Sequence, residues 1–205
     1  MDETRLMIET AQKAPDFTAA RRHMIESQLR TSGINDAYVL ERMAAVPRED
    51  FVPANARAAA YVDRTLALGG GAFLAPPLAY GQILSQARPR QDERALIVGP
   101  ATGYLAALLG PLVSELREAT PDAVLSGDVD GVFDVVLVDG AVEEVPASLI
   151  ATLAPDGRLL TGLLRKGVTK LALGRHSGAD ISLITLNETQ LPRLPAFDKP
   201  QGWTF

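Results

Sequence analysis

Residues 95–109 read ALIVGPATGYLAALL. The apolar start of this stretch predicts a buried strand, Gly99 allows a tight turn, and a helix is expected from Tyr104. Gly103 opens that helix, where the N–H groups of a strand-turn-helix face a bound ligand in nucleotide-binding proteins. The stretch lacks both the full GxGxxG fingerprint and the GxxxxGK[ST] phosphate loop, so by itself it indicates a fold class and no particular ligand.

Short apolar segments alternate with helical patterns after this turn. Residues 132–138 (VFDVVLV) and 157–164 (GRLLTGLL) predict strands, and residues 143–154 (EEVPASLIATLA) predict a helix between them. Such alternation is typical of an α/β fold with a mostly parallel sheet. Residues 170–175 (KLALGR) and 180–186 (DISLITL) follow with no helix between them, so we expect an antiparallel pair at one edge.

The N-terminal part of the chain has helical periodicity instead. Asp16 is placed to cap a helix over 17–29 that ends at Gly33, and an Asn-Asp pair opens a second amphipathic helix over 35–46. Prolines and a run of three glycines then interrupt the pattern until a further helix begins near Pro77.

We expect a single domain over residues 1–205, because this length suits one buried core. Residues 1–76 form its N-terminal helical and loop region, and residues 77–205 form the α/β core with a C-terminal tail. The tail is rich in proline, and we expect it to lie over the surface with Trp203 and Phe205 as packing anchors.

Composition excludes several kinds of site and partner. The formal net charge of −5 gives no electrostatic reason to expect nucleic acid or an anionic membrane. There is no cysteine, and His23 and His176 lack metal-ligand spacing, so we expect no disulfide, thiolate or metal site. No apolar run reaches the roughly 18 residues of a membrane span, and residues 1–17 lack a secretory-signal pattern, so we expect a cytoplasmic protein.

Three longer segments carry a family resemblance. Residues 21–53 (RRHMIESQLRTSGINDAYVLERMAAVPREDFVP), 60–71 (AYVDRTLALGGG) and 133–160 (FDVVLVDGAVEEVPASLIATLAPDGRLL) resemble the corresponding parts of protein-L-isoaspartate O-methyltransferases. The VPRE and FVP portion of the first segment is particularly specific. The likeness runs, with gaps, from about residue 20 to residue 165.

This resemblance implies both a fold and a reaction. The fold is the Rossmann-like α/β sandwich of methyltransferases that use S-adenosylmethionine, with extra N-terminal helices and an antiparallel edge. The reaction transfers the cofactor's methyl group to the free carboxyl group of isoaspartyl residues in damaged proteins. Proteins or peptides containing isoaspartate are therefore the implied partners, and the chemistry mainly requires positioning and desolvation.

The resemblance also assigns cofactor contacts to the opening stretch. Gly99, Ala101, Gly103 and Tyr104 match the family's turn EIGTGSGY, where this chain reads IVGPATGY. The central glycine is replaced by Ala101 and the acidic residue by Ile97. A proline in the turn also removes one backbone N–H.

The segment after the turn is short. The 34 residues from Ala95 to Asp128 are fewer than the more than about fifty that two βαβ units sharing a strand need. We therefore expect one internal helix, the second, to be deleted. Asp128 matches an aspartate that lies near the adenine in the family, with a plain turn residue as the alternative. Glu115 or Glu118 is a candidate for the ribose-binding acid, with solvated helix charges as the alternative.

The family's catalytic loop, GQTISQP, reads GAFLAPP here. Gly71, Phe73 and Ala75 hold its positions, but Phe73 and Ala75 replace both hydroxyl donors. A substrate carboxylate would then depend on backbone N–H groups of residues 71–74. Asp139 ends a predicted strand, a place where catalytic groups sit in open α/β sheets, and a structural turn is the alternative.

Two functions from different classes follow. The first is a divergent isoaspartyl methyltransferase that binds its cofactor through backbone contacts at residues 99–103. The second is a catalytically inactive methyltransferase fold retained for protein binding or structure. In that case Phe73, Leu74 and Ala75 fill the old pocket, and a partner or a second copy of the chain covers the face left by the missing helix.

Overall fold

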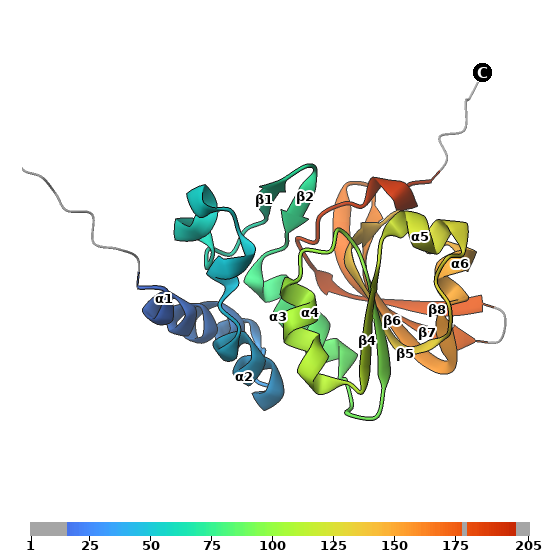
Figure 1. Ribbon diagram of the computed structural model, residues 1–205, viewed down its shortest axis with the longest axis horizontal. Helices are drawn as coiled ribbons and strands as arrows, with labels where there is room; N and C mark the ends of the chain where they lie inside the picture. The colour runs from blue at the N-terminus through green and yellow to red at the C-terminus, as the bar shows by residue number, and fades with distance from the viewer. Residues whose placement is uncertain (1–15, 178–179, 200–205) are drawn as a thin grey trace, which may run out of the picture.

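A computed structural model of the chain describes residues 16–177 and 180–199. Its centre is a six-stranded sheet of order β4-β3-β5-β6-β7-β8, with helices on both faces (Figure 1). The first four strands in this order are parallel, whereas β7 and β8 run antiparallel to their neighbours, as expected for the edge. The strands are β3 (Arg94–Val98), β4 (Glu115–Ala119), β5 (Phe133–Val142), β6 (Leu153–Arg165), β7 (Val168–Ser177) and β8 (Asp180–Glu188), with a separate hairpin of β1 (Leu66–Gly69) and β2 (Ala72–Leu74).

The central strands of the sheet are continuous apolar runs, and their side chains are buried on both faces of the sheet. Along β3, Ala95 and Ile97 belong to one hydrophobic cluster and Leu96 and Val98 to another, as the alternation of side chains along a strand requires. The first cluster includes the N-terminal helices and the side chains beneath α3 and α4. The second lies under α5, α6 and the end of the described chain.

The helices differ greatly in length, and those that follow β3 are short. The α-helices are α1 (Phe17–Met24), α2 (Ala37–Ala45), α3 (Pro77–Ala87), α4 (Tyr104–Leu109), α5 (Pro121–Ser126) and α6 (Ala147–Ile150). A π-helical turn over Ile25–Leu29 extends α1, and 3-10 turns lie at Arg30–Ser32, Arg48–Phe51, Ala54–Ala59, Gly110–Leu112 and Pro195–Phe197.

The two N-terminal helices are confirmed. The Asp16 carboxylate accepts a hydrogen bond from the Ala19 N–H at 3.0 Å, which caps α1. Gly33 ends the helical run with a φ of +86°, a conformation that glycine adopts without strain. α2 buries Val39 and Met43 in the first cluster. The boundary that we expect at residue 76 between a helical region and the core remains a prediction.

The expected deletion of the second helix is wrong. Between Gly103 and Asp128 the chain forms α4, β4 and α5, so the missing element of the expected order is the strand that should follow α5. Residues 121–126 are helical because Pro121 stands at the first helical position and the Thr120 hydroxyl accepts from the Ala123 N–H at 3.2 Å. Strand β4 is consequently an edge of the sheet.

Other parts of the chain also differ from expectation. The helix predicted over 143–154 is observed only over α6, because β6 already begins at Leu153. The tail packs as expected where it is described, since Phe197 is buried, but Trp203 and Phe205 lie outside the described residues. Among the helices that the structure describes, none has the length and apolar character needed to cross a membrane.

Candidate active site

The turn over residues 99–103 links β3 to α4 at the carboxyl end of the sheet. The Gly99 N–H donates to the Ala119 carbonyl at the end of β4, with 3.1 Å between N and O. A Cβ atom on Gly99 would lie 2.9 Å from the Cβ of Asp139, so only glycine fits there. Gly103 has a φ of +78° and precedes the first residue of α4, Tyr104. The two glycines are therefore required by a close approach and by a left-handed backbone, respectively.

Ala101 is the unusual residue of this turn. It is exposed, and its φ of +51° places an alanine in the left-handed region. That conformation costs an L-residue roughly 1–2 kcal/mol, which a glycine would not incur. The turn thus keeps a backbone suited to glycine at the position where the resemblance predicts glycine, although the residue has changed.

Asp139 lies directly beside the turn. Val98 of β3 pairs with Val138 of β5, and the next residue on each strand is Gly99 and Asp139. The Asp139 side chain is buried, and its Oδ2 accepts a hydrogen bond from the Thr102 hydroxyl at 3.3 Å. Its Oδ1 is also buried and has no partner among the described residues. Burial raises the pKa of Asp139 to about 6, against the smaller lowering effects of the Tyr80 and Thr102 hydroxyls and of Arg48.

A buried arginine connects the turn to the catalytic loop. The guanidinium of Arg48 donates to the carbonyl oxygens of Ala60 and Ala75, and its carbon lies 4.9 Å from the ring centre of Tyr104 and 5.6 Å from that of Tyr80. Arg48 makes no ion pair within the described parts of the chain. The sequence analysis did not single out Arg48, although it lies within the specific VPRE segment.

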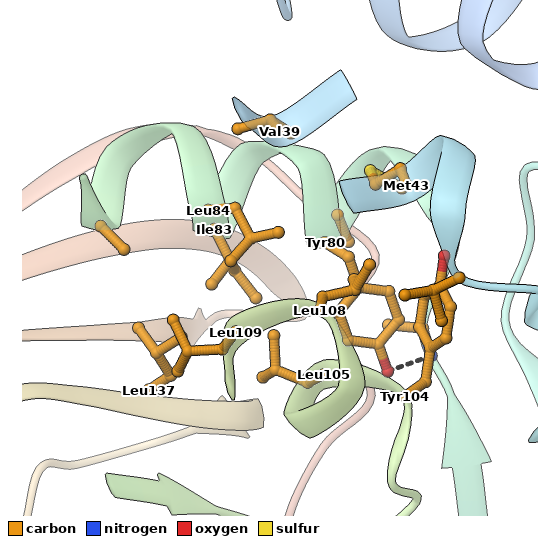
Figure 2. Packing of buried hydrophobic residues seen from close by; sticks show 14 of the residues in the cluster. Val39, Met43, Tyr80, Ile83, Leu84, Tyr104, Leu105, Leu108, Leu109 and Leu137 are labelled. Atoms are coloured by element: carbon orange, nitrogen blue, oxygen red, sulfur yellow. Dashed lines mark hydrogen bonds between the residues drawn. The ribbon is translucent and has the colours of Figure 1, made fainter. Parts of the chain in front are cut away.

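Tyr80 and Tyr104 complete this cluster from α3 and α4. Their rings meet edge to face with 5.2 Å between centres, and Figure 2 shows them side by side beneath these helices. The Tyr80 hydroxyl accepts from the Ala75 N–H at 3.3 Å, and burial raises the pKa of Tyr80 well above its usual range. The Tyr104 hydroxyl is buried and has no described partner. Tyr80 is a second site residue that the sequence analysis missed.

The loop over residues 71–75, which the resemblance predicts to be catalytic, lies in a hairpin. Gly71 is exposed with a φ of +82°, and in the hairpin pairing Phe73 stands opposite Ala67. The Phe73 side chain is 40% exposed, so it does not fill a pocket, and the expectation that it does so is wrong. Ala75 is fully buried, with its N–H and its carbonyl oxygen held by Tyr80 and Arg48. The loop therefore has a fixed backbone and offers no side-chain donor at these positions.

The acidic candidates lie in different places around the sheet edge. Glu115 begins β4, at the end of the strand away from the turn, and binds Arg94 with 2.9 Å between Oε2 and Nε. Glu118 is exposed one residue before the end of β4 and pairs with Ile97. This placement favours Glu118 over Glu115 as the acid near the turn. Both are strand residues and not helix residues, but both are exposed, so a role as plain solvated charges stays open.

Asp128 follows α5 and is exposed, and its Oδ2 accepts from the Ser126 hydroxyl at 2.6 Å. Its backbone N–H donates to the Ala123 carbonyl at the end of that helix. A contact with an adenine remains a prediction for this residue.

Comparisons with known proteins agree with the motifs at this site. The family model described as protein-L-isoaspartate(D-aspartate) O-methyltransferase (PCMT) matches residues 19–120. A protein-L-isoaspartate O-methyltransferase from Koribacter versatilis is 35% identical over 175 residues, covering 72% of this chain and 79% of the relative. One from Opitutus terrae is 32% identical over 182 residues, covering 76% and 78%.

The chain belongs to the protein-L-isoaspartate O-methyltransferase family. Solved structures agree on the fold. A Plasmodium falciparum protein assigned to the same family, solved in complex with S-adenosyl-L-homocysteine, superimposes with a TM-score of 0.68 at 18% identity and covers 89% of this chain and 99% of its own. A second protein-L-isoaspartate O-methyltransferase gives a TM-score of 0.66 at 18% identity, covering 85% of this chain and 65% of its own.

The comparisons also locate the difference from the family. The alignment with the Koribacter methyltransferase spans 175 positions although it uses only 72% of a 205-residue chain, so it contains gaps opposite this chain. The match to the family model ends at residue 120, one residue after the end of β4. The chain is therefore shorter than its aligned relatives, and in its structure β4 is an edge of the sheet.

Proposed function

We propose that this chain binds S-adenosylmethionine at the 99–103 turn and methylates the free carboxyl group of isoaspartyl residues in cytoplasmic proteins. Family membership supports the reaction. The observation that carries the proposal is the left-handed Ala101, because a strained backbone persists only where its surroundings hold it and strain of this kind clusters at ligand sites. The turn is also open to a ligand at this exposed residue.

The residues around the turn fit such a cofactor. Gly99 and Gly103 allow a close backbone approach, and Glu118 stands one residue before the end of β4 and Asp128 just after α5. We assign the ribose hydroxyls to Glu118 and the adenine side to Asp128. When bound, the cofactor supplies an electrophilic methyl group, which a carboxylate oxygen of the substrate takes up in one displacement. The protein's part is to hold the carboxylate in line and to exclude water.

The number of free hydrogen-bond donors in the loop over residues 71–75 determines how strongly it holds a substrate carboxylate. Because Ala72–Leu74 pairs with β1 and the Ala75 N–H is bonded to Tyr80, the free donors of this loop are few. The exposed Phe73 ring stands where the family places a threonine. We therefore expect weak substrate binding that improves when a hydroxyl donor returns at this position.

An assay of methyl transfer from labelled S-adenosylmethionine tests this proposal. An isoaspartyl peptide is the substrate, and the same peptide with ordinary aspartate is the control. Measurable transfer to the isoaspartyl peptide alone is expected, and Phe73→Thr should raise kcat/KM about tenfold whereas Phe73→Ala, which removes the ring without adding a donor, should not. Equal or absent transfer to both peptides would contradict the proposal.

The loss of loop donors also favours a second function. In that alternative, the chain is an inactive methyltransferase fold that binds a protein partner. Strand β4 is the free sheet edge left by the missing strand, and a partner strand or a second copy of the chain could pair there. The charged side chains of β4 oppose nonspecific pairing, so a partner would need complementary charges. Failure to bind any adenosyl ligand, together with a stable oligomer in light scattering, would favour this alternative.

A further inference from the structure

The Asp139 carboxylate is an incompletely bonded charge in the interior. Asp139 is 2% exposed. Its Oδ2 accepts a long hydrogen bond from the Thr102 hydroxyl, and its Oδ1 has no partner among the described residues. Leaving a buried carboxylate oxygen unpaired costs free energy, and native proteins satisfy most such atoms. An unpartnered buried oxygen beside this turn therefore calls for a partner that the described residues do not supply.

The position of this carboxylate matches what the turn has lost. Where the family resemblance predicts an acidic residue before the turn, this chain has Ile97, whose side chain is buried in the first hydrophobic cluster. Asp139 brings a carboxylate to the same turn from the neighbouring strand, with its Cβ under Gly99 and its Oδ2 on Thr102. In this chain the carboxylate beside the turn therefore comes from β5 and not from β3.

The groups that face Asp139 do not neutralise it. The Tyr80 hydroxyl from α3 and the Arg48 guanidinium from the Arg48–Phe51 turn both favour the charged carboxylate, but neither makes a hydrogen bond to it among the described residues. Arg48 donates through Nε and Nη2 to two carbonyl oxygens, its Nη1 has no partner among the described residues, and no ion pair there joins it to Asp139. Glu118 from β4 adds a second negative charge. The surroundings therefore favour a cationic hydrogen-bond donor at Oδ1.

We propose that Asp139 binds the protonated α-amine of an amino-acid-bearing adenosyl ligand seated on the 99–103 turn. The inference rests on the proposed cofactor site and names the residue that selects this part of the ligand. A carboxylate and an ammonium form a strong, charge-assisted hydrogen bond when both are shielded from water. Ligands that lack the amino-acid portion would bind without this contact.

Calorimetric titration of the full chain with two ligands tests the assignment. S-adenosylhomocysteine carries the amine, and 5′-methylthioadenosine has the same adenosyl thioether without it. Asp139→Asn is expected to weaken S-adenosylhomocysteine about tenfold and to leave 5′-methylthioadenosine unchanged. Asp156→Asn is the matched control, because it removes the same charge from an exposed residue near the start of β6, at the other end of the strands.

The pH dependence of ligand affinity is a second test of the assignment, and it needs no variant. The wild-type affinity for S-adenosylhomocysteine should fall several-fold as the pH drops from 7.5 to 5.5, because Asp139 takes up a proton, while 5′-methylthioadenosine binding stays level. This measurement decides the question if Asp139→Asn does not fold.

Three outcomes would overturn the inference while leaving the cofactor site intact. They are equal weakening of both ligands by Asp139→Asn, no effect on either, and a larger loss for 5′-methylthioadenosine than for S-adenosylhomocysteine. Failure of both ligands to bind the wild-type chain would instead overturn the proposed function, and the inference with it.

Discussion

At the scale of single residues, the 99–103 turn shows a sequence that has changed while its backbone has not. Ala101 holds a φ of +51° and Asp139 holds an unpaired oxygen, and both reduce stability. Residues that reduce stability at a binding turn are those that a ligand, once bound, can compensate. Their energetic effects can be measured separately from ligand binding.

Replacing Ala101 by glycine should stabilise the protein. The substitution relieves the left-handed strain and loses part of that gain to the greater freedom of glycine in the unfolded chain, so the unfolding free energy should rise by about 1 kcal/mol. Urea denaturation measures the change. Ala106→Gly inside α4 is the control and should lower stability by about 1 kcal/mol. A destabilising Ala101→Gly would show that the turn is not strained.

Asp139 should make stability depend on pH. Its ordinary pKa of 3.8 is raised to about 6 in the folded protein, so the folded state holds a proton that the unfolded state releases between these values. The unfolding free energy therefore falls as pH rises from about 4 to about 6. Asp139→Asn should then be more stable than wild type by about 3 kcal/mol at pH 7.5 and by little at pH 4. An equal difference at both pH values in urea titrations would contradict this account.

Among the helices and strands, the pattern of apolar residues predicted those whose buried face is evident from the segment's own sequence. Helices α1 and α2 follow from their apolar faces, with the Asp16 cap on α1 alone, and β3 and β5 follow from their apolar runs. The hairpin of β1 and β2 was not predictable, because its strands are three and four residues long and separated by glycines. Strand β4 looks helical in sequence, since its form comes from the register with β3.

The segment after β4 was misread for a related reason. Its short length indicated a deletion, but length alone could not tell which element was absent. The Thr120 cap and Pro121 favour a helix at residues 121–126, so the strand is the element that is missing.

Arg48 is the side chain that holds several elements together, and its loss should be severe. It bonds the carbonyl oxygens of Ala60 and Ala75 from a fully buried position. Arg48→Met leaves both oxygens unpaired, and the unfolding free energy should fall by about 3 kcal/mol. Arg57→Met, at an exposed arginine of the next turn, is the control and should change stability by less than about 0.5 kcal/mol. Thermal or urea denaturation that finds a loss of under about 1 kcal/mol for Arg48→Met would contradict the assigned role.

At the scale of the whole molecule, the sequence predicted the sheet and the turn but only part of the site. Gly99, Gly103 and Tyr104 lie together in the chain and could be assigned from one motif. Arg48, Tyr80 and Asp139 reach the turn from three separate elements, and the contact between Arg48 and Ala75 spans 27 residues. Such a cluster is created by folding, so local patterns do not reveal it. Asp139 was visible only as the end of a predicted strand.

The central claim is that this shortened member of the family still binds an adenosyl cofactor at its altered turn. Calorimetric titration of the purified full chain with S-adenosylhomocysteine, after removal of any co-purified ligand, tests it most directly. We predict binding of one molecule per chain with a micromolar Kd, close to −8 kcal/mol. Absence of both heat and a thermal shift at millimolar ligand would contradict the account and leave the protein-binding alternative.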